Sequence, residues 1–144
     1  MNKRVLSGGA VLSALLIAGW AIFIRQPAQI ATAPEETGEA LVAVTLPAAF
    51  SETEQMGAQV FEAKCAACHG VNAAGRDGVG PPLVHVIYEP SHHGDQAFHL
   101  AAMNGVRGHH WPFGNMPAIE GLTTGDVDSI VAYVRVLQRA NGIN

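Results

Sequence analysis

Apolar residues follow a helical spacing most clearly near the C-terminus of the chain. They recur at intervals of three and four, as on one face of a helix: Val127, Ile130, Val131, Val134 and Leu137. Thr123 or Thr124 can cap the start of this helix, and Gly142 can stop it. Asp126 and Asp128 near the start suit the positive end of the helix dipole. The pattern predicts an amphipathic helix whose apolar stripe packs into a core.

A second helix is predicted from about Glu52 to Cys65. Ser51 and Glu54 have the spacing of a capping box, in which each side chain bonds the backbone N–H of the other residue. Gly57 is a poor helix former. Close approach of another helix would be a physical reason for a glycine at this position.

A shorter helix is predicted from about Asp95 to Asn104, because Phe98, Ala101 and Ala102 fall at i, i+3 and i+4. Gly105 supplies a C-terminal stop. The remaining segments are rich in glycine and proline. We expect irregular structure over residues 70–80, a short extended piece or helical turn over 83–87, and a loop over 106–119.

The N-terminal region carries an uncharged apolar run of 20 residues, from Val5 to Ile24. That length is enough to cross a bilayer as a helix. Lys3 and Arg4 precede the run and only Arg25 follows it, and the more positive end favours the cytoplasm. We therefore expect residues 1–25 to be a single-pass anchor in the cytoplasmic membrane, with the rest of the chain in the periplasm.

A cleaved signal peptide is the alternative interpretation of this segment. Ala31-Thr32-Ala33 has the small-x-small form of a cleavage site. We favour a retained anchor because the apolar run is longer than a usual signal core and Ala33 lies nine residues beyond Ile24. A mature N-terminus near Pro34 would contradict the anchor.

Residues 26–50 are predicted to be a linker, and residues 51–144 the folded domain. The linker stretch contains prolines and glutamates but few residues large enough to form a core. A short strand through Leu41, Val42 and Val44 is the alternative.

The charge of the folded domain limits the classes of partner that it can bind. From Ser51 onward five lysines and arginines stand against nine aspartates and glutamates, a formal charge of −4. Binding to nucleic acid requires a basic surface, so this class of partner is excluded. An acidic domain suits a protein partner with a basic docking patch.

The stretch Cys65-Ala66-Ala67-Cys68-His69 carries the predicted chemistry. Cys-x-x-Cys-His is the attachment signature of a c-type haem. Each thiol can add to one haem vinyl group, and the two-residue gap lets both sulfurs reach the same edge of the porphyrin. His69 then lies under the ring and can give an imidazole nitrogen to the iron. The motif predicts one covalently attached haem c.

Three other interpretations of the cysteine pair are weaker. A thioredoxin-like redox couple needs a βαβ setting, and no alternating strand and helix pattern surrounds the pair. Zinc normally takes four ligands, and the chain has no second cysteine pair. A disulfide across two intervening residues would close almost no loop.

Two later residues complete the predicted haem site. The Pro81 carbonyl could accept the second N–H of His69; the alternative is that the prolines here only stiffen a loop. Met116 is the predicted sixth ligand of the iron, on a loop folded over the open haem face, because a thioether is a soft donor. Met56 is not expected to reach that face, and Met103 is expected in the core.

Taken together, these features resemble class I mono-haem cytochromes c over roughly residues 52–140. Besides the haem motif, the matching positions are Gly57, Phe61, Gly80-Pro81-x-Leu83, Asn104-Gly105, Met116-Pro117 and Leu122-Thr123-x-x-Asp126-x-x-x-Ile130-x-x-Tyr133-x-x-x-Leu137. The resemblance implies an all-α fold wrapped on the haem. It also implies that Gly57 and Phe61 meet the last helix near Tyr133.

By the same resemblance, the Pro81 carbonyl orients His69, and Met116 is the distal iron ligand. The implied function is a membrane-anchored electron carrier, not an enzyme, because two axial ligands leave no position for a substrate. Its redox donor and acceptor would be membrane respiratory complexes or a copper oxidase or reductase. The alternatives are a haem entry subunit of a larger oxidase, dehydrogenase or reductase complex, and a haem sensor with a labile sixth ligand.

The histidines between Tyr88 and Phe113 are unusual for small members of this family. They are His92, His93, His99, His109 and His110. We expect solvated loop residues. The alternatives are contact with the haem propionates, copper binding, which imidazole suits, and replacement of Met116 by His109 or His110 as the distal ligand.

Overall fold

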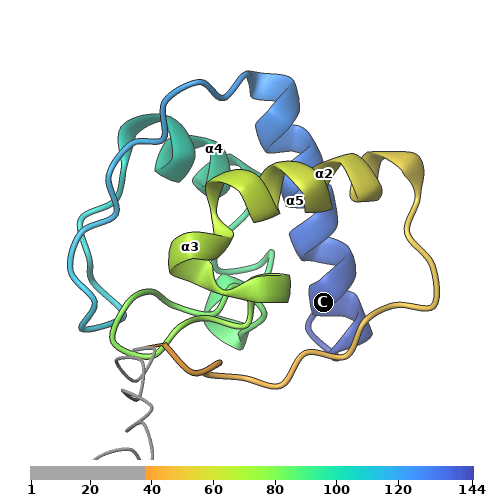
Figure 1. The fold of residues 1–144 in the computed structure, drawn as a ribbon, viewed down its shortest axis with the longest axis horizontal. Coiled ribbons are helices and arrows are strands. Elements are labelled where there is room, and N and C mark those ends of the chain that lie inside the picture. The colour runs from red at the N-terminus through yellow and green to blue at the C-terminus, as the bar shows by residue number, and fades with distance from the viewer. Residues whose placement is uncertain (1–37) are drawn as a thin grey trace, which may run out of the picture. The chain divides into compact units, whose positions relative to one another are not determined.

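The structure is a computed structural model that describes residues 38–144 (Figure 1). The predicted anchor over residues 1–25, the possible cleavage site Ala31-Thr32-Ala33 and the linker up to residue 37 lie outside the described residues. The described part is mostly helical and contains no strand. None of its helices has the length and apolar character needed to cross a membrane.

The helices of the described part are α2 (Glu52–Lys64), α3 (Ala66–His69), α4 (Asp95–Asn104) and α5 (Thr124–Ala140), with the short 3₁₀ helices η1 (Val71–Ala73) and η2 (Val86–Tyr88). The three predicted helices, α2, α4 and α5, lie close to their predicted positions, whereas α3 and η1 were not predicted. The predicted loop over residues 106–119 contains no helix. Its ends are joined by an isolated antiparallel pairing of Val106 with Met116.

Each of the two longest helices of the described part begins at a capping box. At the start of α2, the Ser51 hydroxyl accepts the N–H of Glu54, and the Glu54 carboxylate accepts the N–H of Ser51 at 2.7 Å. Thr123 and Asp126 make the same reciprocal pair at the start of α5, so Thr123 is the cap. Each box satisfies N–H groups that have no partner inside the helix.

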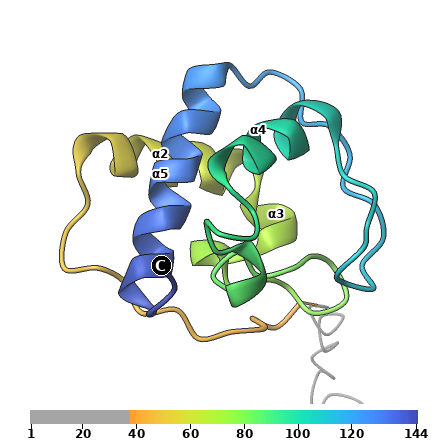
Figure 2. The same ribbon diagram turned by 180° about the vertical axis from the view of Figure 1, so that it is seen from behind.

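Helices α2 and α5 cross in close contact, as both views of the ribbon show (Figures 1 and 2). Gly57 lies at the crossing, where an added Cβ would be only 1.9 Å from the Ser129 carbonyl oxygen. The buried Phe61 ring packs on Tyr133, with ring centroids 5.6 Å apart. Gly57 and Phe61 therefore meet α5 near Tyr133, and this prediction is confirmed.

Arg135 of α5 ties the segment before α4 to the core. Its guanidinium donates to the backbone carbonyls of Tyr88 at 2.7 Å and His93 at 2.5 Å, and to the Asp95 carboxylate at 2.8 Å. Only 7% of Arg135 is exposed. A buried guanidinium needs several acceptors, so this network fixes the loop between η2 and α4 in one position.

The second half of the predicted linker, residues 38–50, is hydrogen-bonded to the domain. The Thr45 N–H donates to the side-chain oxygen of Asn141, just beyond α5, and the Asn141 side-chain nitrogen donates to the Thr45 carbonyl, both at 2.9 Å. Leu41 donates its N–H to a backbone carbonyl of the loop after η1. No helix or strand forms in this stretch. The packed part of the chain thus begins before residue 51.

Candidate functional site

A cavity of about 320 Å³ lies between the Cys-x-x-Cys-His segment and the loop over residues 106–119. Its walls are mostly apolar and include Phe61, Leu83, Phe98, Val127 and Ile130. Four of the five predicted site residues also line it: Cys65, His69, Pro81 and Met116. Cys68 does not line the cavity and is exposed.

His69 is held in one orientation by a backbone carbonyl. Its Nδ1 lies 2.9 Å from the carbonyl oxygen of Pro81. Because a carbonyl can only accept, Nδ1 carries the proton and Nε2 keeps its lone pair. Burial lowers the pKa of His69 and outweighs the opposing effect of the Pro81 hydrogen bond. The side chain is therefore a neutral imidazole whose Nε2 lone pair is free to coordinate a metal ion.

The two cysteines lie on one short turn. Cys65 is the last residue before α3, and the N–H of Cys68 donates to the Cys65 carbonyl at 3.0 Å. Gly80 allows the following loop to pass against this turn, since a Cβ there would be 2.5 Å from the Cys68 carbonyl oxygen. Burial, with a smaller contribution from Cys68, raises the pKa of the Cys65 thiol to about 11. Before haem is attached, the Cys65 thiol therefore stays protonated at neutral pH.

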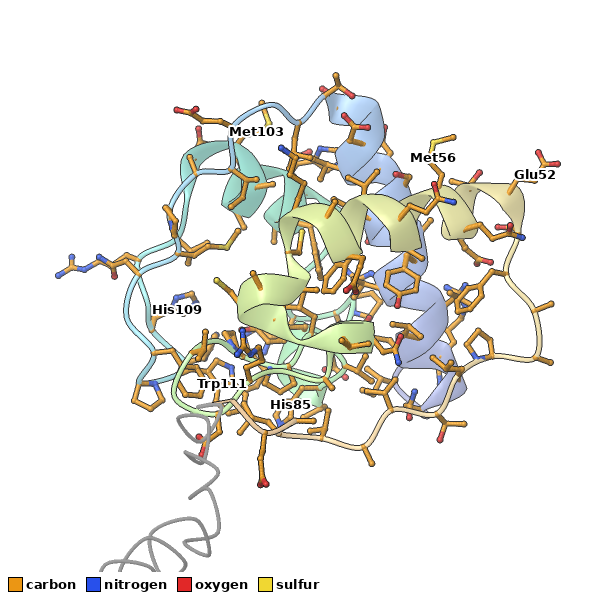
Figure 3. The ribbon with its side chains drawn as sticks, viewed as in Figure 1. Glu52, Met56, His85, Met103, His109 and Trp111 are labelled. Carbon is orange, nitrogen blue, oxygen red and sulfur yellow. The ribbon has the colours of Figure 1, made fainter. Side chains whose placement is uncertain are left out.

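Met116 lines the cavity from the loop over residues 106–119. Residues 106–116 of this loop form a hairpin, because the N–H and the carbonyl of Met116 both pair with Val106, each at 2.9 Å. These hydrogen bonds fix the Met116 backbone at the base of the hairpin. The other two methionines of the described part do not line the cavity. Met56 is 58% and Met103 50% exposed (Figure 3). The prediction that Met103 belongs to the core is wrong, because it lies on the solvent side of α4.

Trp111 was not predicted as a site residue, yet it is one of the residues that line the cavity. Its Nε1 is buried and has no hydrogen-bond partner. The Tyr88 hydroxyl lies near the indole N–H. Burial raises the pKa of Tyr88, and the indole N–H has a smaller, opposite effect. No hydrogen bond of normal geometry joins the two groups. A buried N–H without an acceptor is unfavourable.

The structure separates the histidines into two sets. His99 is apart from the other histidines, because its Nε2 lies 3.0 Å from the Asp128 carboxylate. His93, His109 and His110 line the cavity, and His92 stacks on His93. Loss of solvation and then the neighbouring imidazoles lower the pKa of His110. His92, His109 and His110 are exposed and lie in loops, as expected. Their clustering with His93 was not predicted.

The family model of cytochrome c matches residues 55–138. The chain belongs to the cytochrome c family. Haem c, with its iron, is therefore the covalently bound cofactor of this cytochrome. Cys65 and Cys68 are the two cysteines in the sequence.

The cytochrome is also similar to the cytochrome bc1 complex cytochrome c subunits of Mycobacterium bovis and Mycobacterium tuberculosis. The identity is 28% over 151 residues, covering 97% of this chain but 42% of each relative. The chain thus spans less than half the length of these curated relatives. No solved structure gives a significant match.

The residues around the cavity of this cytochrome fit haem c. The apolar walls suit the porphyrin, and the neutral His69 offers Nε2 to the iron. Cys65 and Cys68 lie one turn apart on the short segment that ends at His69, as attachment of both sulfurs to one haem requires.

Proposed function

We propose that this cytochrome transfers electrons through one haem c that is attached to Cys65 and Cys68, with His69 and Met116 as axial ligands. The bound haem supplies an iron that alternates between the ferric and ferrous states. The observation that carries the proposal is that His69 and Met116 line one apolar cavity from separate chain segments. It follows that this cytochrome is an electron carrier with a closed iron site.

The surrounding residues set the properties of that site. Pro81 fixes the ring plane of His69 through the 2.9 Å hydrogen bond, and the Val106 pairing fixes the Met116 backbone. A thioether ligand and apolar walls both disfavour the extra charge of the ferric state, so they raise the reduction potential. Exposed Cys68 lies where a redox partner can approach.

We propose that the domain lies on the periplasmic side of the cytoplasmic membrane, anchored by residues 5–24. The uncharged run and the charge bias around it support this location. The proposed partners are membrane respiratory complexes or a copper oxidase or reductase. The formal charge of −4 from residue 51 onward favours a basic docking patch on the partner.

Replacement of the proposed distal ligand tests this function. In the full-length cytochrome, Met116→Ala should open the sixth coordination position. The reduced variant should bind carbon monoxide, the weak long-wavelength band of methionine-ligated ferric haem should disappear, and the midpoint potential should fall. Absorption spectroscopy and redox titration measure these changes.

Met103→Ala is the matched control, because Met103 is 50% exposed and does not line the cavity. It should leave the spectrum and the potential unchanged. A wild-type protein that binds carbon monoxide as readily as the Met116 variant would instead support a sensor with a labile sixth ligand. Spectral changes in His109→Ala or His110→Ala, with none in Met116→Ala, would assign the distal position to histidine.

A second candidate function is that of a permanent haem subunit within a respiratory complex. The names of the mycobacterial relatives favour it. A permanent subunit should copurify with its complex in a fixed ratio after detergent extraction. A mobile carrier should instead be recovered alone and show weak, salt-sensitive docking.

A further inference from the structure

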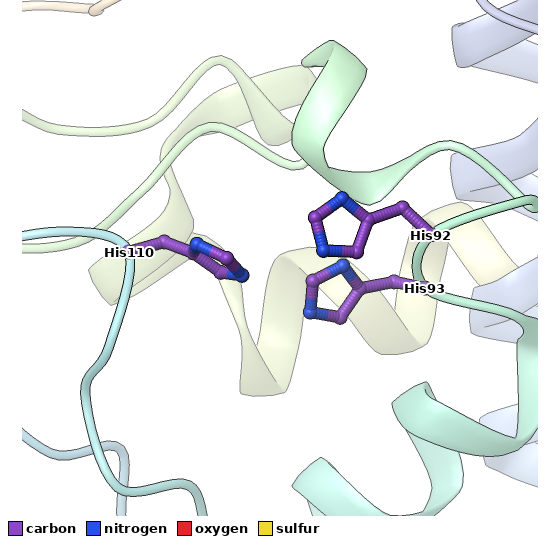
Figure 4. Close-up of side chains that lie close together, drawn as sticks. All are labelled: His92, His93 and His110. Atoms are coloured by element: carbon purple, nitrogen blue, oxygen red, sulfur yellow. The ribbon is translucent and has the colours of Figure 1, made fainter.

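We propose that His92, His93 and His110 form a binding site for one divalent transition-metal cation, distinct from the haem iron. One ring nitrogen from each residue lies within 4.8 Å of the others (Figure 4). The rings of His92 and His93 stack with centroids 4.7 Å apart, and His110 meets them edge-on at 5.3 and 5.2 Å. Two loops far apart in the sequence supply these residues.

The donor set identifies the class of cation. Imidazole nitrogen suits Zn²⁺, Cu²⁺ and Ni²⁺, whereas Mg²⁺ and Ca²⁺ prefer oxygen ligands. In a tetrahedral zinc site with Zn–N bonds of about 2.0 Å, the donor atoms lie about 3.3 Å apart. Cation binding would have to draw the three donor atoms together from the present spacing, which is within 4.8 Å. The fourth ligand would be water or His109, whose ring centroid lies 4.2 Å from that of His110.

Backbone contacts already orient one half of the site. The Nδ1–H of His93 donates to the Ile87 carbonyl at 2.6 Å, which leaves Nε2 free as a donor atom. The backbone carbonyl of His93 accepts from buried Arg135. Histidine ligands of metals commonly have their second nitrogen held by a carbonyl in this way.

His110 supplies the other half from the hairpin that ends at Met116. The hairpin is closed by the Val106 pairing and by a 3.0 Å hydrogen bond from the Gly108 N–H to the Asn115 side chain. A cation bound to the three histidines would join this hairpin to the loop between η2 and α4. The cation would therefore brace the segment that carries Met116.

Zinc is the probe for this site because it is redox-inert. The full-length, haem-loaded cytochrome is treated with chelator and titrated with Zn²⁺ by isothermal calorimetry. We expect one Zn²⁺ per chain in the wild type. The variant His92→Ala, at a residue that does not line the haem cavity, should bind at least tenfold more weakly. X-ray absorption at the zinc edge, which is separate from that of iron, should show nitrogen neighbours at about 2.0 Å.

His99→Ala is the matched control, because His99 pairs with Asp128 and lies outside the three-histidine group. It should bind Zn²⁺ like the wild type. An unchanged visible spectrum in His92→Ala and His99→Ala shows that the haem site is intact. The proposal is overturned if the wild type shows no saturable binding, if His99→Ala weakens binding as much as His92→Ala, or if zinc has no nitrogen neighbours.

Discussion

At the scale of single residues, the haem site depends on backbone groups as well as on side chains. The Cys-x-x-Cys-His spacing predicts Cys65, Cys68 and His69 because the whole motif is local. The contact of His69 with the Pro81 carbonyl was inferred from a general need of histidine ligands, and the structure has that hydrogen bond. The role of Trp111 could not be predicted, because a lone indole N–H has meaning only once it is buried without a partner.

Trp111→Phe keeps an aromatic ring beside His85 and Phe113 but removes the unpaired N–H. If that N–H bonds a haem carboxylate, it partly neutralises the negative charge near the iron. Its loss should favour the ferric state and lower the midpoint potential, with a loss of stability of about 1–3 kcal/mol. Redox titration and thermal unfolding of the haem-loaded protein measure both effects. An unchanged potential would show that the indole does not contact the cofactor.

At the scale of helices, local sequence signals predicted the three longer helices α2, α4 and α5 but not the short helices α3 and η1. The apolar spacing of α5, the capping box of α2 and the stop after Asn104 each depend on residues close together in the chain. Gly57 was predicted to lie where another helix approaches, and the crossing with α5 confirms it. The local signals could not show how residues 38–50 pack. Thr45 pairs with Asn141, which is 96 residues away.

Gly57→Ala tests the crossing of α2 and α5. The new Cβ would lie 1.9 Å from the Ser129 carbonyl oxygen, a backbone atom that cannot rotate away. We expect a loss of stability of about 1–3 kcal/mol from this overpacking, despite the better helix propensity of alanine. Gly125→Ala is the matched control, because a Cβ there meets only the Thr123 hydroxyl at 3.8 Å. Gly125→Ala should not destabilise in denaturant unfolding; equal losses in both variants would contradict the crossing geometry.

The cap of α5 should make its stability depend on acid pH. The backbone N–H of Thr123, and then its hydroxyl, hold the pKa of Asp126 below its ordinary value of 3.8. A lowered pKa in the folded state means that the stabilisation is complete above that ordinary value and is lost as the pH falls through the folded-state pKa. Asp126→Asn should therefore lower the melting temperature at pH 7, and the difference should shrink in acid. If the difference in melting temperature between the two proteins stays constant below pH 3.8, the charge of Asp126 does not stabilise the helix.

At the scale of the whole molecule, buried Arg135 connects segments that have no local relation. It joins α5 to the end of η2 and to the start of α4, and Gln138 adds hydrogen bonds to Leu83 and Tyr88. The sequence places Arg135 near the C-terminal end of a helix, where a solvated arginine would also be expected. Only the tertiary fold shows that it organises the wall of the cavity. The same limit applies to the three-histidine group, which two distant loops bring together.

Arg135→Met tests this connection. The change keeps an unbranched apolar stem but removes the donor of the His93 carbonyl and of the buried Gln138 amide oxygen, while the Tyr88 carbonyl keeps its hydrogen bond from Gln138. We expect a loss of about 1–3 kcal/mol for each acceptor left unsatisfied, together with increased hydrogen exchange in the loop before α4. Arg139→Met is the control, because its pair with Glu54 is 3.6 Å long and its side chain is 55% exposed. Such a surface pair contributes about 1 kcal/mol or less, so similar losses in both variants would contradict the assigned role of Arg135.

The pairing of Val106 with Met116 fixes the base of the hairpin, whereas Pro112, Gly114 and Asn115 at its outer end are exposed. Extra residues inserted between Pro112 and Asn115 would enlarge this outer end without changing the register at the base. Length variation is tolerated in such exposed turns because the entropic cost of closing a loop grows slowly with the number of its residues. This edge of the molecule could therefore diverge, or be redesigned to recognise a new docking surface, while the thioether stays in place.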